Sequence, residues 1–248
     1  MRPDTPLVDA LRGQQLRIVT WNCHRGPLRP KRARLEALLP TFAAIQECPR
    51  PDVADASFLW HGTNPRQGIG VSVGPGYSVE LAPLRDAPTY NLPVHVHGPQ
   101  PFFALVNWSQ KSSLYVEGIH RAIDAYRDII VANPTVVLGD FNSNLFWDNK
   151  HPTDRNHSAL VQVLSDLGLV SAYHRFFGEA QGEETRPTIY FQWNRDRPYH
   201  IDYCFIPESW TSRLRSVEVG TFEDWADISD HRPITVDLEM PTPSPSAS

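Results

Sequence analysis

Short apolar runs of strand length recur along almost the whole chain, and Gly and Pro residues separate them. The runs are rich in β-branched and aromatic residues, a composition that favours strands over helices. They occupy residues 16–21, 41–45, 57–60, 68–73, 92–96, 102–107, 135–138, 188–193, 201–206, 214–219 and 234–238. About eleven short strands with no long linker between them predict one domain built on two packed sheets.

Three further segments carry apolar residues at helical spacing, and we expect them to form helices outside the sheets. They are residues 31–39, 114–131 and 156–167. In the second of these, Ile119, Ile123 and Ile130 fall on one face, as the helical period requires. The predicted fold class is α/β, with a single domain over residues 1–240 and a disordered Pro/Ser tail at 241–248.

The small number of cysteines and the short apolar segments make several classes of site and partner unexpected for this chain. Cys23, Cys48 and Cys204 form no CxxC pair and are too few for a disulfide framework, so we expect neither a zinc–thiolate site nor a disulfide-linked partner. The first residues contain no signal-peptide pattern, and no run approaches membrane-spanning length. These features favour a cytoplasmic protein without a membrane partner and leave its oligomeric state open.

An acid and an amide follow the buried-strand pattern at residues 136–139. Gly139 lets the backbone turn as the strand ends, and Asp140 and Asn142 follow at i and i+2. In an extended segment this spacing places both side chains on one side. A capped turn could produce the same pattern, so its significance depends on the other strand ends.

Polar residues mark four other strand ends or strands. They are Asn22, Glu47, Asp202, and the adjacent pair Asp230 and His231. Each has a simpler explanation, because Asn22 could cap a turn, Glu47 could be a solvated loop acid, and Asp202 could belong to a buried ion pair. Taken together, they offer the groups that metal-assisted phosphoester hydrolysis requires.

The expected metal is a hard divalent cation held by oxygen atoms. Asn22, Glu47 and Asp230 would supply such ligands for Mg²⁺, with Mn²⁺ as the alternative. A site this acidic accepts a phosphoester only if cations neutralise it.

The other polar residues are assigned to the attacking water and the phosphoryl group. Asp140 is the candidate proton acceptor for the water, and Asn142 would hydrogen-bond that water or the phosphorus centre. Asp202 would hold His231 in one tautomer and raise its pKa, so that the imidazole can bind or protonate a phosphoryl oxygen.

These residues, in this order, resemble the endonuclease/exonuclease/phosphatase superfamily over residues 16–239. The matching segments are Trp21-Asn22, Gln46-Glu47, Gly139-Asp140-Phe141-Asn142, His200-Ile201-Asp202-Tyr203 and Ser229-Asp230-His231-Arg232-Pro233. The superfamily includes exonuclease III, apurinic/apyrimidinic-site endonucleases, pancreatic deoxyribonuclease, sphingomyelinases and inositol polyphosphate phosphatases. The resemblance implies a four-layered α/β/β/α sandwich of two mixed β-sheets flanked by helices.

The resemblance also implies where each matching residue acts. Asn22 and Glu47 would lie at the metal, with Asp230 at or near it. Asp140 and Asn142 would lie at the attacking water, and Asp202 would orient His231.

The chain departs from the family pattern at the end of the strand that precedes the long helix. Many family members carry His or Tyr there, whereas this chain has Asn107 and Trp108, followed by Lys111. Asn107 can donate a hydrogen bond to phosphate but cannot act as an acid. Trp108 could stack on a base or fill the core, and Lys111 could supply positive charge.

Two sets of residues suggest nucleic acid as the substrate. The first is a basic run into the first predicted helix, made of Arg25, Arg29, Lys31, Arg32 and Arg34. Cations at a helix N-terminus oppose the macrodipole, so contact with phosphates, above all by Arg29 and Arg32, is one explanation and a solvated basic face is the other. The second set is the aromatic and histidine residues near strand ends, such as Trp60, Trp147, Trp193 and His200, which could stack on unpaired bases or pack the core.

The segment 146–157 follows the proposed catalytic strand and is expected to face the substrate. Arg155 and His157 are its candidate phosphate contacts. The sequence thus predicts a Mg²⁺-dependent DNA nuclease. The alternatives are a phosphatase or phosphodiesterase for a small or lipid-borne phosphate, and a catalytically impaired nucleic-acid-binding module.

Overall fold

Two six-stranded mixed β-sheets form the centre of the computed structural model, which describes residues 15–53 and 55–240. The first sheet has the order β13-β14-β1-β2-β4-β3. Its strands are β1 (Gln15–Asn22), β2 (Phe42–Gln46), β3 (Phe58–Asn64), β4 (Gln67–Val73), β13 (Leu214–Val219) and β14 (Ile234–Glu239). Only β1 and β2 pair in parallel in this sheet.

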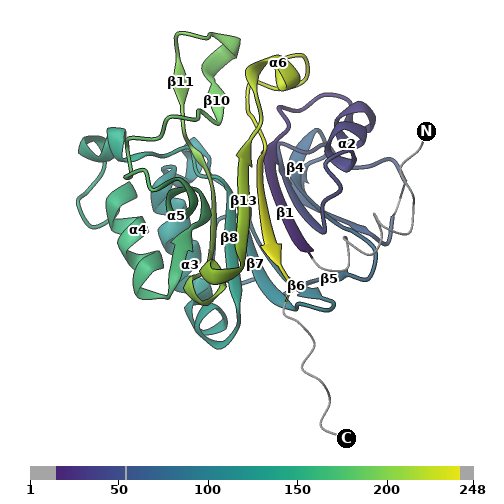
Figure 1. Ribbon diagram of the computed structural model, residues 1–248, viewed down its shortest axis with the longest axis horizontal. Helices are drawn as coiled ribbons and strands as arrows, with labels where there is room; N and C mark the ends of the chain where they lie inside the picture. The colour runs from purple at the N-terminus through teal and green to yellow at the C-terminus, as the bar shows by residue number, and fades with distance from the viewer. Residues whose placement is uncertain (1–14, 54, 241–248) are drawn as a thin grey trace, which may run out of the picture.

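The second sheet has the order β5-β6-β7-β8-β12-β9. Its strands are β5 (Ser78–Leu81), β6 (Asn91–His97), β7 (Phe102–Trp108), β8 (Thr135–Asp140), β9 (Leu169–Ser171) and β12 (Asp202–Pro207). Here β7 and β8 form the parallel pair. A separate two-stranded ribbon, β10 (Ile189–Tyr190) and β11 (Pro198–Tyr199), projects beyond the sheets (Figure 1).

Helices cover the outer face of each sheet (Figure 1). The α-helices are α2 (Leu28–Glu36), α3 (Val116–Ala132), α4 (His157–Asp166), α5 (Ala172–Phe177) and α6 (Phe222–Trp225). Short 3₁₀ helices lie between the strands: η1 (Lys111–Ser113), η2 (Leu145–Lys150), η3 (Phe191–Trp193) and η4 (Glu208–Arg213).

Alternation of side chains along the strands builds these layers. In β1, Leu16 and Ile18 enter the core between the sheets, whereas Val19 and Trp21 face the cluster beneath α2. In β8, Val136 joins the core between the sheets and Val137 packs under α3 and α4. Strands β1 and β8 therefore each supply two apolar faces, and the predicted α/β/β/α sandwich is confirmed.

The structure corrects several predicted element boundaries. The first helix spans 28–36 rather than 31–39, and the segment predicted as a strand at 188–193 forms only the two residues of β10 before turning into η3. Strands β5, β9 and β11 and the short helices α5 and α6 were not predicted. The predicted tail at 241–248 lies outside the described residues.

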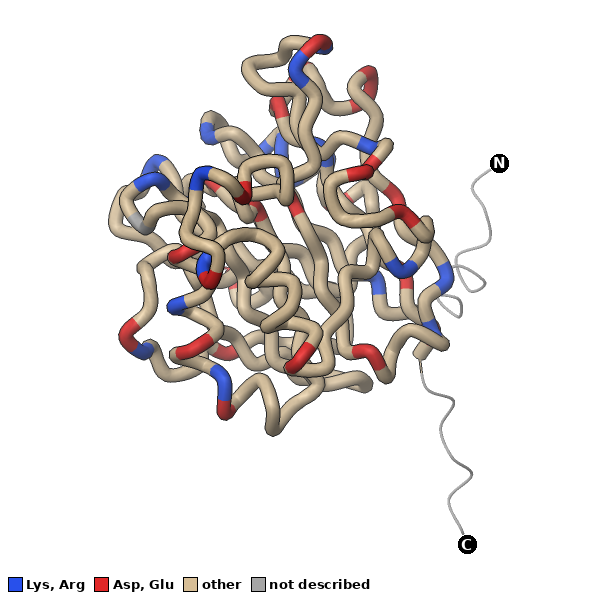
Figure 2. Tube along the Cα trace, turned by 90° about the vertical axis from the view of Figure 1, so that its left-hand side faces the viewer, with Lys and Arg blue, Asp and Glu red and all other residues tan. Residues whose placement is uncertain are grey.

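Basic and acidic residues are interleaved over the side of the molecule seen in Figure 2. Many charged residues of the described chain are paired, for example Arg85 with Asp128 and Arg155 with Asp124. This side therefore presents no broad field of a single sign.

Candidate active site

The end of β8 brings the two sheets' polar residues together. Gly139 has a φ of +137°, and a Cβ added there would lie 1.9 Å from the carbonyl oxygen of Asn107. Only glycine permits this close approach of β7 to β8. Asp140 follows at once, and the antiparallel register places it directly opposite Asp202 of β12.

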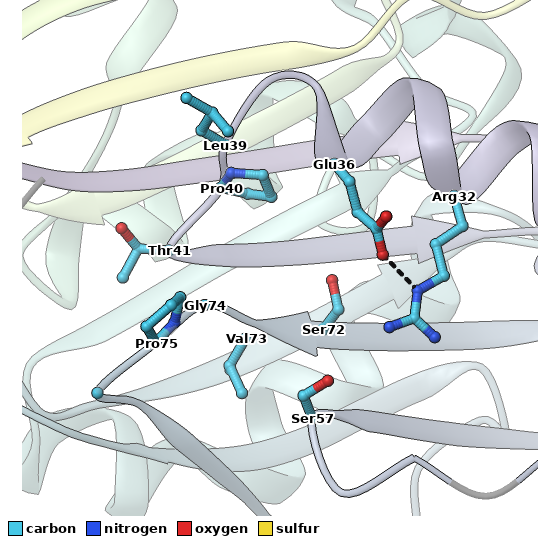
Figure 3. Close-up of a pocket in the computed structure, with 11 residues that line it drawn as sticks. Arg32, Glu36, Leu39, Pro40, Thr41, Ser57, Ser72, Val73, Gly74 and Pro75 are labelled. Carbon is cyan, nitrogen blue, oxygen red and sulfur yellow. Dashed lines mark hydrogen bonds and ion pairs between the residues drawn. The ribbon is translucent and has the colours of Figure 1, made fainter. Parts of the chain in front are cut away.

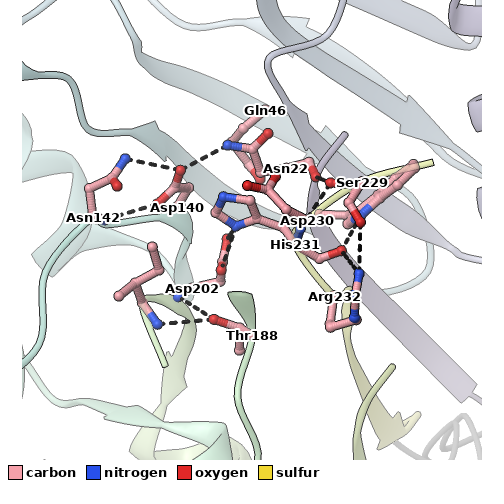
Figure 4. A network of polar contacts seen from close by, with 12 residues as sticks. Asn22, Gln46, Asp140, Asn142, Thr188, Asp202, Ser229, Asp230, His231 and Arg232 are labelled. Carbon is pink, nitrogen blue, oxygen red and sulfur yellow. Dashed lines mark hydrogen bonds and ion pairs between the residues drawn. The ribbon is translucent and has the colours of Figure 1, made fainter. Parts of the chain in front are cut away.

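Asp140 is fully enclosed by hydrogen-bond donors (Figure 4). Asn142 adopts a left-handed conformation with a φ of 46°, which Asn tolerates better than most residues. Its backbone N–H donates to Asp140 Oδ1 at 2.9 Å, and its Nδ2 donates to Oδ2 at 3.1 Å. Nδ2 of Asn22, from β1 in the other sheet, donates to the same Oδ2 at 2.9 Å. Burial, together with the negative charge of Asp202, raises the pKa of Asp140 to about 7.

His231 and Asp202 form a buried pair next to Asp140 (Figure 4). Nδ1 of His231 lies 2.9 Å from Asp202 Oδ2, and the backbone N–H of Asp202 donates to Oγ1 of Thr188. Burial alone would lower the pKa of His231, but the carboxylate of Asp202, helped by that of Asp140, raises it to about 10. The imidazole is therefore held as a cation with Nδ1–H directed at Asp202.

Two further carboxylates line the same pocket and lie beside basic side chains. Glu47, with a φ of 52°, pairs with Arg25 at 3.0 Å. Oδ1 of Asp230 is buried 3.0 Å from Nδ1 of His24 without making a well-directed hydrogen bond. Burial raises the pKa of Asp230, but His24 and His231 outweigh this effect and lower it overall.

These side chains open into a pocket of about 630 Å³. Glu47, Asp140, Asn142, Asp230 and His231 line it directly. Asn22 and Asp202 lie behind this lining and hold Asp140 and His231 in place. The structure therefore brings together all seven residues that the sequence assigned to catalysis or metal binding.

A somewhat larger cavity of about 730 Å³ lies beside the end of α2, away from these acids (Figure 3). Among the described residues that line it, only Arg32 and Glu36 are charged, and they pair with each other at 2.7 Å. Arg32 also pairs with Asp55, and no histidine stands beside an acid in this lining, so the pocket at Asp140 is the candidate active site.

Two sets of residues could hold a metal ion. Asp140, Asp202 and His231 have ligand atoms within 4.8 Å of one another, but the imidazolium of His231 repels a cation and already occupies Asp202. The predicted set of Asn22, Glu47 and Asp230 offers oxygen atoms. Oδ1 of Asp230 makes no well-directed hydrogen bond, and Glu47 pairs with the guanidinium of Arg25, so this set fits a place where positive charge is stabilised.

None of the eight predicted substrate contacts lines the pocket. Asn107 is buried and donates to the backbone oxygen of Asp140 at 2.7 Å, and Trp108 packs against Tyr90. His157 and His200 are also buried, with hydrogen bonds to Ser143, Gln181 and the Arg186 oxygen. Arg155 pairs with Asp124, and Arg32 pairs with Glu36 and Asp55.

Arg29 and Lys111 lie at the start of α2 and in η1 and likewise do not line the pocket. Lys31, another member of the basic run, is buried against the oxygen atoms of Cys23 and His24. Direct contact of any of these residues with substrate therefore stays a prediction.

The pocket is lined instead by other aromatic and basic residues. Trp147, Lys150 and His151 belong to the segment 146–157, which the sequence analysis expected to face the substrate without assigning them individual contacts. No signal in the sequence pointed to the remaining residues of this kind, His24, Tyr115, Phe191, Arg197 and Tyr199. The ribbon residues became neighbours of β8 only through the tertiary fold.

The chain has the fold of the endonuclease/exonuclease/phosphatase superfamily, as its motifs predicted. One similar solved structure is the 3′ phosphatase NExo from Neisseria, bound to product DNA hairpin, with 21% identity, coverage of 90% of this chain and 99% of that chain, and a TM-score of 0.67. Another is the AP endonuclease LMAP from Leishmania major, with 14% identity, coverage of 97% and 92%, and a TM-score of 0.68.

An endonuclease/exonuclease/phosphatase protein from Beutenbergia cavernae matches with 15% identity, 92% coverage of this chain, 72% of that chain and a TM-score of 0.59. No protein-family model matches the sequence, and no curated protein matches it. The likeness is therefore one of fold. The part of the chain that the structure describes contains no helix long and apolar enough to cross a membrane.

Proposed function

We propose that this protein is a divalent-metal-dependent phosphodiester hydrolase and that its substrate is DNA. The observation that carries the proposal is the meeting of Asp140 with the Asp202–His231 pair in one pocket that Glu47 and Asp230 also line. In-line attack of water on a phosphoester requires a base for the water, a cationic group that binds the phosphoryl oxygens and oxygen ligands for a metal ion. Asp140 would be the base, His231 the cationic group, and Asn22, Glu47 and Asp230 the oxygen ligands.

Asp140 acts as the proton acceptor. A pKa of about 7 leaves it partly ionised near neutral pH, which is the range in which a general base works best. The donors of Asn142 and Asn22 fix both of its oxygen atoms. The carboxylate therefore keeps one orientation toward the pocket.

His231 stabilises negative charge on the phosphoryl group. Its Nδ1–H is committed to Asp202, so Nε2–H remains to donate to a phosphoryl oxygen. A cation held by Asn22, Glu47 and Asp230 would polarise the phosphoryl oxygens and offset charge on the leaving oxygen.

The NExo structure supports DNA as the substrate, because that protein was captured with a product DNA hairpin. Its description as a 3′ phosphatase also makes removal of a terminal phosphate from DNA the second candidate for this chain. The two reactions use the same attack on phosphorus and differ in the leaving group.

A panel of substrates tests the proposal. Single-stranded DNA, duplex DNA with an abasic site, plasmid DNA and 3′-phosphorylated DNA are compared with inositol phosphates and p-nitrophenyl phosphate, each with Mg²⁺, Mn²⁺ or EDTA. We expect EDTA-sensitive hydrolysis of DNA. Hydrolysis confined to the small phosphates would contradict the nuclease proposal.

Replacement of the base provides the matching variant. Asp140→Asn should lower kcat on DNA by a factor of about 10² to 10⁴, because the amide cannot accept the proton of water. Asp166→Asn, on the outer helix α4, serves as the control and should keep full activity. An Asp140→Asn enzyme that retains its turnover would show that another group is the base.

A further inference from the structure

One wall of the pocket is aromatic and cationic, in contrast to the acids opposite it. Trp147 and Lys150 come from η2, and Phe191, Arg197 and Tyr199 come from the β10–β11 ribbon and its turn. Figure 1 shows the ribbon standing clear of both sheets. We call these five residues the aromatic wall.

Core packing does not account for the aromatic wall. None of its three rings belongs to the hydrophobic clusters between the sheets or beneath the helices. Phe191 is 39% exposed. Trp147 and Tyr199 are half-buried and contact each other, with ring centroids 5.1 Å apart and planes at 46°, and Trp147 also meets Phe146. Partly exposed rings grouped in a pocket indicate a place where a ligand binds.

The turn that carries Phe191 is strained. The next two residues, Gln192 and Trp193, have φ values of 55° and 57°, a region that non-glycine residues enter at a cost. The N–H of Gln192 reaches Oδ2 of Asp230 at 3.4 Å. The strained turn thus connects the aromatic wall to an acid of the active site.

The cations of the wall are free to meet anions. Arg197 lies over the Phe191 ring at 4.5 Å, and Lys150 lies 6.0 Å from the Trp147 ring. Within residues 15–53 and 55–240, no carboxylate pairs with either of them. By contrast, the neighbouring Arg195 pairs with Glu223 at 2.7 Å.

A ligand that matches this wall has a flat π face and negative charge beside it. A nucleotide has both, whereas an inositol phosphate has no ring face to stack. In a duplex the base faces are already covered by their neighbours, so a side-chain ring can stack only on an unpaired base.

We propose that the aromatic wall is a subsite for an unpaired nucleobase next to the scissile phosphate, so that the preferred substrate is single-stranded or frayed DNA. The base stacks on Trp147 or Phe191, and Lys150 and Arg197 contact flanking phosphates. This inference rests on the proposed function, because it assumes that the scissile phosphate lies at Asp140 and His231.

Binding can be measured separately from hydrolysis in the Asp140→Asn background, by fluorescence anisotropy at fixed salt. The probes are a labelled oligothymidylate, an abasic oligomer of the same length and charge, and a blunt duplex. We expect oligothymidylate to bind at least about tenfold more tightly than the abasic oligomer, since stacking acts on the base alone. Tighter binding of the duplex than of the single strand would overturn the proposal.

Variants assign the preference to the wall. Trp147→Leu and Phe191→Leu keep apolar bulk but remove the ring face, and each should lower the preference for oligothymidylate over the abasic oligomer. Phe176→Leu, at an exposed ring on α5 outside the pocket, should leave it unchanged. Thermal unfolding of each variant confirms that it is folded.

Two results separate the subsite from the proposed function. If the wild-type enzyme hydrolyses DNA but binds both oligomers equally, or if neither ring substitution lowers the preference, the subsite is wrong and the nuclease stands. If the wild-type enzyme binds oligothymidylate selectively through these rings yet hydrolyses no DNA, the subsite is right and the proposed catalysis is wrong.

Discussion

His157 belongs to a chain of side-chain hydrogen bonds directly behind the active site, which the peptide bond between Ser143 and Asn144 closes into a ring. The ring begins at Ser143 and ends at the adjacent Asn144, two residues after Asn142. Its members are Ser143, His157, Gln181, His174, Glu184 and Asn144, with successive distances of 3.2, 3.2, 3.3, 3.0 and 3.1 Å. The ring ties the loop that follows the proposed base to two distant segments of the chain.

Gln181 joins the two imidazoles of the ring. Its Oε1 lies 3.2 Å from Nε2 of His157 and its Nε2 lies 3.3 Å from Nδ1 of His174. Nδ1 of His157 meets the Ser143 hydroxyl, and Nε2 of His174 meets Glu184. Burial lowers the pKa of His157 to about 4, so this imidazole is neutral near neutral pH.

The pH dependence of stability follows from this neutral histidine. Between pH 6.5 and 4 the unfolded chain protonates His157 while the folded chain does not, so the free energy of unfolding falls as the pH falls. His157 should contribute a loss on the order of 3 kcal/mol across this window. Urea unfolding from pH 7 to 4 measures it, and His157→Gln should show a weaker dependence on pH. His61→Gln is the control and should keep the wild-type change of the free energy of unfolding with pH. If His157→Gln also kept that change, His157 would not titrate as a buried group.

At the scale of single residues, the sequence predicted the acids and His231 of the pocket but only part of the rest of its lining. The acids stand at or near strand ends, and a strand end can be recognised from the apolar run before it. His157 was predicted as a phosphate contact from its place in the segment after β8, and His200 as a ring that could stack on a base, but packing against Tyr203 of β12 and Tyr173 of α5 buries the two imidazoles. A polar side chain can be buried only where residues distant in the sequence supply its hydrogen bonds. The local sequence does not show which residues those are.

At the scale of elements, the parallel pair β7–β8 sets the position of the proposed base. Gly139→Ala would place a methyl group 1.9 Å from the Asn107 oxygen at a φ of +137°, and the backbone of β7 cannot move without breaking its ladder. We expect a loss of about 3 kcal/mol or more in the free energy of unfolding. Urea denaturation measures this loss.

Gly76→Ala is the matched control for that substitution. Gly76 has a φ of +79° but no atom within 4 Å of an added Cβ, so only the backbone conformation is penalised, by about 1 kcal/mol. If both variants lost the same stability, the close approach of β7 and β8 would not be what requires glycine at position 139.

Long buried strands were predictable, whereas short exposed elements were not. The central strands carry apolar residues on both faces, which makes them visible as continuous runs. By contrast, β5 is an edge strand with the residues Ser-Val-Glu-Leu and is mostly exposed. The β10–β11 ribbon has two residues per strand, and its pairing depends on a turn far too short to show a period. The part of the aromatic wall on the ribbon, Phe191, Arg197 and Tyr199, was missed for this reason.

At the scale of the whole molecule, the mild net charge of −5 hides an uneven distribution. The basic run at the start of α2 is largely neutralised within the protein, because Arg25 pairs with Glu47, Arg32 with Glu36 and Asp55, and Arg34 with Asp227. Four carboxylates, those of Glu47, Asp140, Asp202 and Asp230, lie in or directly behind the pocket. The cations that pair with them are fewer, Arg25 and the imidazolium of His231. A divalent ion should therefore bind the folded state and not the unfolded chain.

Metal binding should appear as an increase in stability. Mg²⁺ at about 100 times its Kd should raise the free energy of unfolding by about 2.7 kcal/mol, and EDTA should remove this gain. Thermal unfolding in MgCl₂, compared with NaCl of equal ionic strength, measures the specific part. Glu47→Gln should reduce the gain because it removes a ligand charge from the pocket, while Asp166→Asn on α4 should retain it. If NaCl stabilised the protein equally, or if Glu47→Gln responded to Mg²⁺ as the wild type does, the cation would be acting as general ionic screening and Glu47 would not be a ligand.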